Sequence, residues 1–183
     1  MFSSVRVSKP YKKSVSVFFS SGKIPRSAHK SVTVAAKRPG FESAPGDISE
    51  SYGVEGHAIV VGIGEGTMQD WRLAGSSLAR FIAKIGASSL SLEGDNFNED
   101  SAQAVAEQFG LLSWNPVLFR GSAGKTIKRG AVSLQSKNAT IEKALKKGLV
   151  LAECTNLCRT LVQTPPNIAT PAFMATAATK LAK

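Results

Sequence analysis

The last third of the chain, residues 138–183, reads NATIEKALKKGLVLAECTNLCRTLVQTPPNIATPAFMATAATKLAK. From Thr140 onward its apolar residues recur every three or four positions, which places them on one stripe of a helix. The positions on this stripe are Ile141, Leu145, Gly148 or Leu149, Ala152, Leu157 and Leu161. Pro165 ends the pattern, because a proline lacks the N–H donor and clashes with the preceding turn. The stretch therefore predicts one long helix over residues 140–163.

Polar residues mark where helices begin in this region. Asn138 or Thr140 can cap the long helix, and capping also accounts for the match of residues 138–140 to a glycosylation sequon. Thr170 and Pro171 are typical of the cap and the first turn of a further helix. The apolar positions of that helix are Phe173, Met174, Ala177, Ala178 and Leu181. We expect this stripe to face water, so that the isolated chain self-associates or frays beyond the double proline.

The run over residues 152–167 resembles the linker helix of the leucyl aminopeptidase family. In that family the pattern Asn-Leu-x-Arg-x-Leu-Val-x-x-Pro-Pro-Asn joins a small N-terminal domain to a metal-dependent catalytic domain. Here the pattern begins at Asn156, includes Arg159, and is followed by the pair Thr170 and Pro171. The resemblance implies that Arg159 makes an ion pair or reaches the interface between the two domains, without a catalytic role.

Strand and helix patterns alternate upstream of the linker. The expected elements are strands over residues 57–63, 88–92 and 131–134, a helix over 67–85 capped by Gly86, a helix from Asn98 or Asp100, and the long helix over 140–163. This order and these lengths predict an α/β layered domain whose mostly buried sheet is flanked by helices. The resemblance further implies a small, macro-domain-like fold over residues 57–163. It also implies that residues 164–183 are the start of a catalytic domain.

Positive charge is concentrated at the N-terminus. Nine of the 23 lysines and arginines and none of the 13 acidic residues lie in residues 1–41, so the rest of the chain is close to neutral. Residues 1–40 are therefore interpreted as a basic leader, either an organellar transit peptide for a mitochondrion or plastid or a disordered tail, with a cytoplasmic location otherwise. Residues 41–56 are interpreted as a connector. Neither a nucleic-acid partner nor a membrane span is favoured.

Two glycine-rich motifs invite comparison with nucleotide-binding loops. Gly62, Gly64 and Thr67 come close to the dinucleotide fingerprint, but residues 85–88 lack the acidic residue that would meet the ribose, so a tight strand-to-helix turn is favoured. Residues 121–126, Gly-Ser-Ala-Gly-Lys-Thr, lack the first glycine of a P-loop, because that position is Phe119. We expect a surface turn there.

The cysteines and histidines do not form a ligand set in the sequence. Cys154 and Cys158 are spaced four residues apart on the predicted helix, and both histidines, His29 and His57, lie far away. We therefore expect the cysteines to be small buried thiols in a reducing compartment. His57 is expected to be a structural or an exposed residue.

The acidic residues do not form the convergent cluster that a two-metal hydrolase needs. We therefore expect no catalytic, cofactor-binding or metal-binding residue in this chain, and no peptide hydrolysis by it alone. The resemblance implies two divalent ions, zinc or manganese, and a hexamer for the whole enzyme, with the catalytic domain or further copies as partners. The alternative is a stand-alone, non-enzymatic binding or oligomerisation module for an ADP-ribose-like ligand or DNA.

Overall fold

A computed structural model describes residues 2–8, 14–24, 30–54, 56–115, 117, 119 and 130–182 of the chain. The described residues form a six-stranded sheet in the order β1-β6-β5-β2-β4-β3. In that spatial order the strands are Phe2–Val7, Gly130–Gln135, Ser89–Gly94, Val15–Ser20, Gly56–Gly62 and Ile48–Gly53. Neighbouring strands run parallel, except that β3 is antiparallel to β4.

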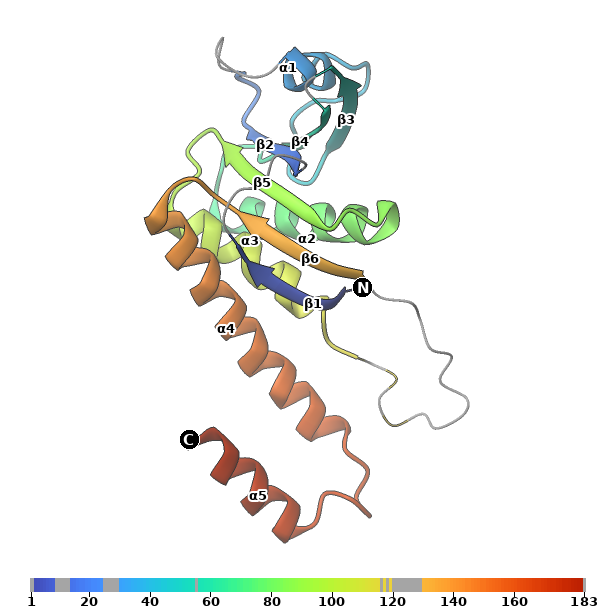
Figure 1. Cartoon of the computed structure of the whole chain (residues 1–183), viewed down its shortest axis with the longest axis vertical. Helices are drawn as coiled ribbons and strands as arrows, with labels where there is room; N and C mark the ends of the chain where they lie inside the picture. The colour runs from blue at the N-terminus through green and yellow to red at the C-terminus, as the bar shows by residue number, and fades with distance from the viewer. Residues whose placement is uncertain are drawn as a thin grey trace.

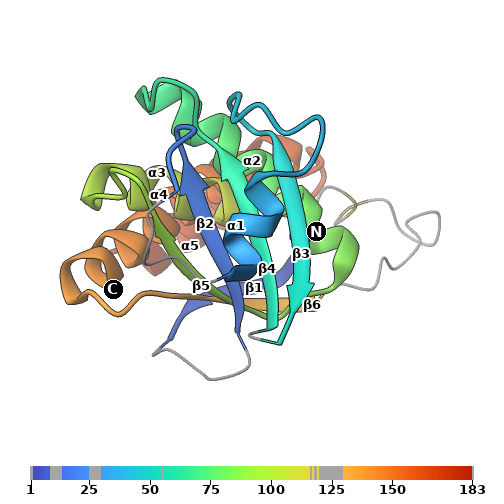
Figure 2. The same cartoon turned by 90° about the horizontal axis from the view of Figure 1, so that it is seen from above.

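Helices cover both faces of the sheet (Figures 1 and 2). Helix α1, Lys30–Ala36, packs over β3 and β4 on one face. The opposite face carries α2, α3 and α4, which span Met68–Ile85, Glu99–Leu111 and Ala139–Gln163. Helix α5, Pro171–Leu181, follows at the C-terminal side and has no buried residue. The predicted α/β layered fold, with a mostly buried sheet flanked by helices, is confirmed, and the structure adds that the sheet is mostly parallel.

Most of the apolar core lies between the sheet and the face that carries α2, α3 and α4. Phe19, on the fourth strand in spatial order, is fully buried there, and its ring contacts the rings of Trp71 and Phe97 at 5.1 and 5.2 Å between centroids. A smaller cluster between the sheet and α1 contains Phe18, from the same strand, and Val32. Strand β2 is therefore buried on both faces, as expected for a central strand of a parallel sheet.

The strands are staggered, and this allows β1 and β2 to be joined by a short connection. Val7 pairs with Leu134, Leu134 pairs with Leu90, and Leu90 pairs with Val15. Strand β1 therefore ends at the level where β2 begins, although two other strands lie between them.

The buried Gln135 side chain holds the two ends of this connection on the sheet. Its amide nitrogen donates to the hydroxyl oxygens of Ser8 and Ser89, at 3.2 and 2.7 Å, and its amide oxygen accepts from the hydroxyl of Ser14 at 2.6 Å. Ser8 and Ser14 flank the connection, so one amide fixes the entry to and the exit from it.

The predicted division of the first 56 residues is wrong. Strands β1 and β2 and helix α1 come from residues 1–40, which were expected to be a leader, and β3 comes from the expected connector at 41–56. The short apolar patch at residues 15–19 has too little local pattern to identify a strand, and it is stabilised by pairing with β4 and β5, which come much later in the chain. Cleavage after residue 40 would remove β1, α1 and the central strand β2.

The other predicted helices and strands are confirmed. Of the predicted alternatives for the start of α3, Asn98 or Asp100, and of α4, Asn138 or Thr140, the asparagine is the cap in both cases. Thr67 and Asn98 cap α2 and α3 through reciprocal capping boxes, and Gly86 ends α2 with a φ of 72°. Asn138 caps α4 and Thr170 caps α5. Among the described residues, no helix is both long and apolar enough to cross a bilayer.

Candidate functional site

The family motif begins in the second half of α4, where the helix runs away from the sheet, and ends in the turn after it (Figure 1). The buried residues of α4 are Ile141, Ala144, Leu145, Gly148 and Ala152. All of them belong to the first fourteen residues of the helix. The predicted stripe position Leu161 is only half-buried, and Val162 beside it is 85% exposed. The predicted apolar stripe is therefore buried in the first half of α4. In the second half the stripe residues are only half-buried.

In the second half of α4, polar contacts connect the helix to the end of α3. The Asn156 side-chain amide donates to the backbone carbonyl of Gly110 at 2.9 Å. Arg159 donates through Nη1 to the carbonyl of Leu111 at 3.3 Å and to Oδ1 of Asn156 at 3.2 Å. The Gly110 carbonyl also accepts from the backbone N–H and the hydroxyl of Ser113, at 3.0 and 2.7 Å, so Asn156 adds a further donor to a helix end that is already capped locally.

Trp114, just beyond α3, completes this group of contacts. Its indole N–H donates to the hydroxyl of Thr160 at 3.1 Å, and the Arg159 guanidinium lies 5.7 Å from the centre of its ring. We call Trp114, Asn156, Arg159 and Thr160 the linker clamp. The resemblance implies an ion pair or an interface contact for Arg159; in the described part of the chain its partners are a carbonyl, an amide and an aromatic ring.

Glycines bring α3 and α4 close enough for the clamp to form. A Cβ atom on Gly110 would overlap the side chain of Ala152, and one on Gly148 would overlap the backbone carbonyl of Gln103. The two helix axes can therefore approach closely at both points. Gly110 thus has two roles. Its lack of a Cβ atom allows the close approach of α4, and its carbonyl accepts a hydrogen bond from the Asn156 amide.

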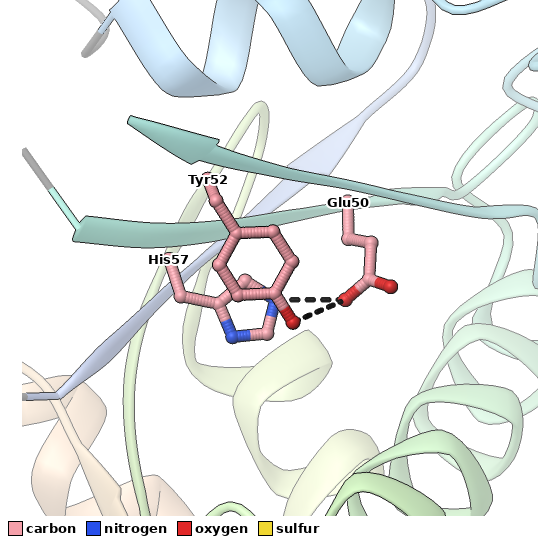
Figure 3. Close-up of polar contacts among 3 residues, drawn as sticks. All are labelled: Glu50, Tyr52 and His57. Atoms are coloured by element: carbon pink, nitrogen blue, oxygen red, sulfur yellow. Dashed lines mark hydrogen bonds and ion pairs between the residues drawn. The ribbon is translucent and has the colours of Figure 1, made fainter. Parts of the chain in front are cut away.

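A second polar cluster lies at the end of the β3–β4 hairpin (Figure 3). Nε2 of His57 is 2.9 Å from Oε2 of Glu50, and the Tyr52 hydroxyl donates to the same oxygen at 3.3 Å. The Tyr52 and His57 rings stack with their centroids 4.2 Å apart. Partial desolvation, and then the charge and the hydrogen bond of Glu50, raise the pKa of Tyr52 above its usual 10.0. This cluster joins the two strands at the hairpin end, and of the two expectations for His57, a structural or an exposed residue, these contacts favour the structural one.

The remaining sequence candidates have different outcomes. Gly62 ends β4, and Gly64 and Gly66 have φ values of 52° and 76° in the turn before α2, as the strand-to-helix turn predicted. The motif at residues 121–126 and His29 lie outside the described residues.

The prediction that the cysteines are buried is wrong. Cys154 and Cys158 are both exposed and free. They lie on the part of α4 that has passed the end of the core, where the outer side of the helix meets water.

The described residues contain no group of three or more His, Cys, Asp or Glu side chains that could hold a metal ion. The Glu50 and His57 pair supplies two such groups.

Known proteins with similar sequences and structures point to one family, although no family model matches the chain. A probable cytosol aminopeptidase of Chlorobaculum tepidum is 28% identical over 197 aligned residues, which cover 91% of this chain and 39% of that enzyme. A variant of tomato leucine aminopeptidase superposes with a TM-score of 0.71 at 20% identity, over 98% of this chain and 42% of that one. The bottromycin maturation enzyme BotP in complex with Mn superposes with a TM-score of 0.68 at 22% identity, over 94% and 36%.

The chain thus spans about two fifths of the length of the curated relative that it matches. The structural matches agree in fold over nearly the whole chain and leave more than half of each neighbour uncovered. The resemblance seen in the motif around Asn156 and Arg159 is confirmed: the chain is similar in sequence to a probable cytosol aminopeptidase and in fold to a leucine aminopeptidase.

Proposed function

We propose that the chain is the N-terminal, non-catalytic domain of a leucyl aminopeptidase-like metallo-exopeptidase, an enzyme that releases N-terminal amino acids from peptides. The observation that carries the proposal is the asymmetry of the match, which covers 91% of this chain but 39% of the related aminopeptidase. The catalytic residues and two divalent ions, zinc or manganese, belong in this proposal to a part of the enzyme outside these 183 residues. Assembly into a hexamer is likewise a property of the whole enzyme.

Exposed apolar side chains on α4 and α5 support the proposal that a further domain packs against these helices. The exposed fractions of Val162, Met174 and Leu181 are 85, 46 and 65%. These apolar side chains lie on α4 and α5, the two helices that carry and follow the family motif. Burying them against a catalytic domain would remove apolar surface from water. In this proposal residues 164–183 begin that domain.

The direct test is an aminopeptidase assay on the purified full chain. Leucine p-nitroanilide and a leucyl dipeptide are supplied with zinc or manganese, and bound metal is measured by mass spectrometry after gel filtration. We expect neither hydrolysis nor a stoichiometric metal ion. Amino-acid release that co-purifies with the chain through two unrelated columns would overturn the proposal.

Sequencing of complete transcripts tests the second half of the proposal. We expect a reading frame that continues past Lys183 into a segment rich in metal-ligand carboxylates. A stop codon at that point in every transcript would favour the stand-alone module. That module makes its own prediction, which is saturable binding of ADP-ribose or duplex DNA at physiological salt.

A further inference from the structure

The second half of α4 contributes no fully buried residue to the core. Its last buried residue is Ala152, and the helix continues to Gln163. Eleven residues therefore extend past the core, and two of them, Leu157 and Leu161, are half-buried. A helix end beyond its fully packed part opens readily, so the order of this segment depends on the contacts that remain.

The remaining contacts described between this segment and α3 are the polar ones of the linker clamp. Asn156 and Arg159 are three residues apart, which puts both side chains on one face of the helix. That face meets the C-terminal end of α3, where the carbonyls of Gly110 and Leu111 accept their hydrogen bonds. The partial negative charge at a helix C-terminus also favours the positive charge of Arg159.

The two side chains hold each other as well as α3. Arg159 donates to Oδ1 of Asn156 at 3.2 Å, which turns the amide so that its nitrogen faces Gly110. Trp114 supports the outer side of the guanidinium and is itself fixed by Thr160. Each group of the clamp thus restricts the rotamer of the next one.

We infer that Asn156 and Arg159 are positioning residues that fix the direction in which α4 leaves the domain. The inference concerns this chain alone and requires no catalytic activity. If the proposed function holds, the clamp also sets the orientation of the catalytic portion relative to this domain. The asparagine and arginine of the family motif would then be explained by a mechanical role.

The test measures the distance between the far end of α4 and the body of the domain. Spin labels are placed at Val162→Cys, near the end of α4, and at Arg80→Cys, on α2, because both residues are exposed. The native thiols are removed by Cys154→Ser and Cys158→Ser, which changes only exposed positions. Pulsed electron paramagnetic resonance then gives the distribution of distances in the folded chain.

Three variants of the labelled chain are compared with it. Asn156→Leu and Arg159→Met keep the side-chain bulk and remove the donors, and the double variant removes both. Thr155→Ala is the matched control, since the Thr155 hydroxyl donates only to the carbonyl of Leu151 within α4 in the contacts described. We expect a broad distribution for the double variant and an unchanged narrow one for the control. A narrow, unchanged distribution in the double variant would overturn the inference.

Hydrogen exchange separates loss of direction from loss of stability. In the double variant we expect the amides of residues 157–163 to exchange roughly tenfold faster, while those of 141–149 keep their protection. Equal acceleration in both segments would contradict a local clamp. If the double variant does not fold, Arg159→Lys is measured in its place. Lysine keeps the positive charge but lacks the planar guanidinium with its several N–H donors. A distribution as narrow as that of the unmodified chain in this milder variant would also overturn the inference.

Discussion

Nε2 of His57 and Oε2 of Glu50 lie 2.9 Å apart across the β3–β4 hairpin, on the same face of the sheet as the stacked ring of Tyr52 (Figure 3). The same carboxylate oxygen of Glu50 contacts both His57 and the hydroxyl of Tyr52. The hairpin end is therefore held by two polar contacts to Glu50 and by a ring stack.

The Tyr52 hydroxyl should titrate above pH 10.0, because desolvation and the Glu50 carboxylate both disfavour the phenolate and raise its pKa. A raised pKa in the folded state adds stability that is present below the unfolded pKa and is lost as pH rises through the folded one. Absorbance at 295 nm in a Tyr11→Phe background would measure it. Glu50→Gln should move the midpoint back toward 10, and an unchanged midpoint would rule out the role of Glu50.

Phe19→Ala should destabilise the domain by about 3–5 kcal/mol, the usual cost of removing a large core side chain. The ring is 0% exposed and touches Trp71 and Phe97. Urea denaturation followed by circular dichroism would measure the change. Phe119→Ala is the matched control, since Phe119 is 36% exposed and should shift the free energy of unfolding by about 0.5 kcal/mol or less. Similar decreases in the free energy of unfolding for both variants would contradict the position of β2 in the middle of the sheet.

Removal of residues 1–40 should abolish cooperative unfolding, because the deletion takes β1, β2 and α1 out of the structure. Strand β4 would lose its parallel neighbour, and β5 would lose the strand that separates it from β4. Thermal melts of the full and shortened chains would show the difference. A shortened chain that melts at the same temperature would restore the interpretation of these residues as a leader.

Gly148→Ala should destabilise the chain by about 1–3 kcal/mol, as overpacking between helices does. Helix propensity alone would favour alanine by about 1 kcal/mol, but the new Cβ would overlap the backbone carbonyl of Gln103, which cannot turn away. Gly130→Ala serves as the control, because nothing lies within 4 Å of the Cβ position there. Chemical denaturation of both variants measures the difference, and a stabilised Gly148→Ala chain would contradict the close approach of α3 and α4.

Cys154 and Cys158 should both react with Ellman's reagent in the native chain, since both are exposed and free. We expect two thiols per chain to react without denaturant and one in the Cys154→Ser variant. Thiols that react only after urea is added would instead support the buried environment that the sequence suggested.

Elements with local signals can be predicted from the sequence. The N-caps at Asn98, Asn138 and Thr170 and the left-handed Gly86 act within one turn of the helix ends that they mark. The periodicity of the long helices and the continuous apolar run of β4 are equally local. The linker motif indicates the family on its own, because its order and spacing are specific.

Features that depend on partners distant in the sequence become visible in the folded chain. Strand β2 is a short patch in a basic segment, and it becomes a core strand because β4 and β5, from much later in the chain, pair with it on both sides. The exposure of Cys154 and the targets of Asn156 and Arg159 depend on where the core ends beneath α4 and where α3 ends beside it. Periodicity assigns a face to a residue, but the length of the neighbouring element decides whether that face meets apolar side chains, carbonyl groups or water.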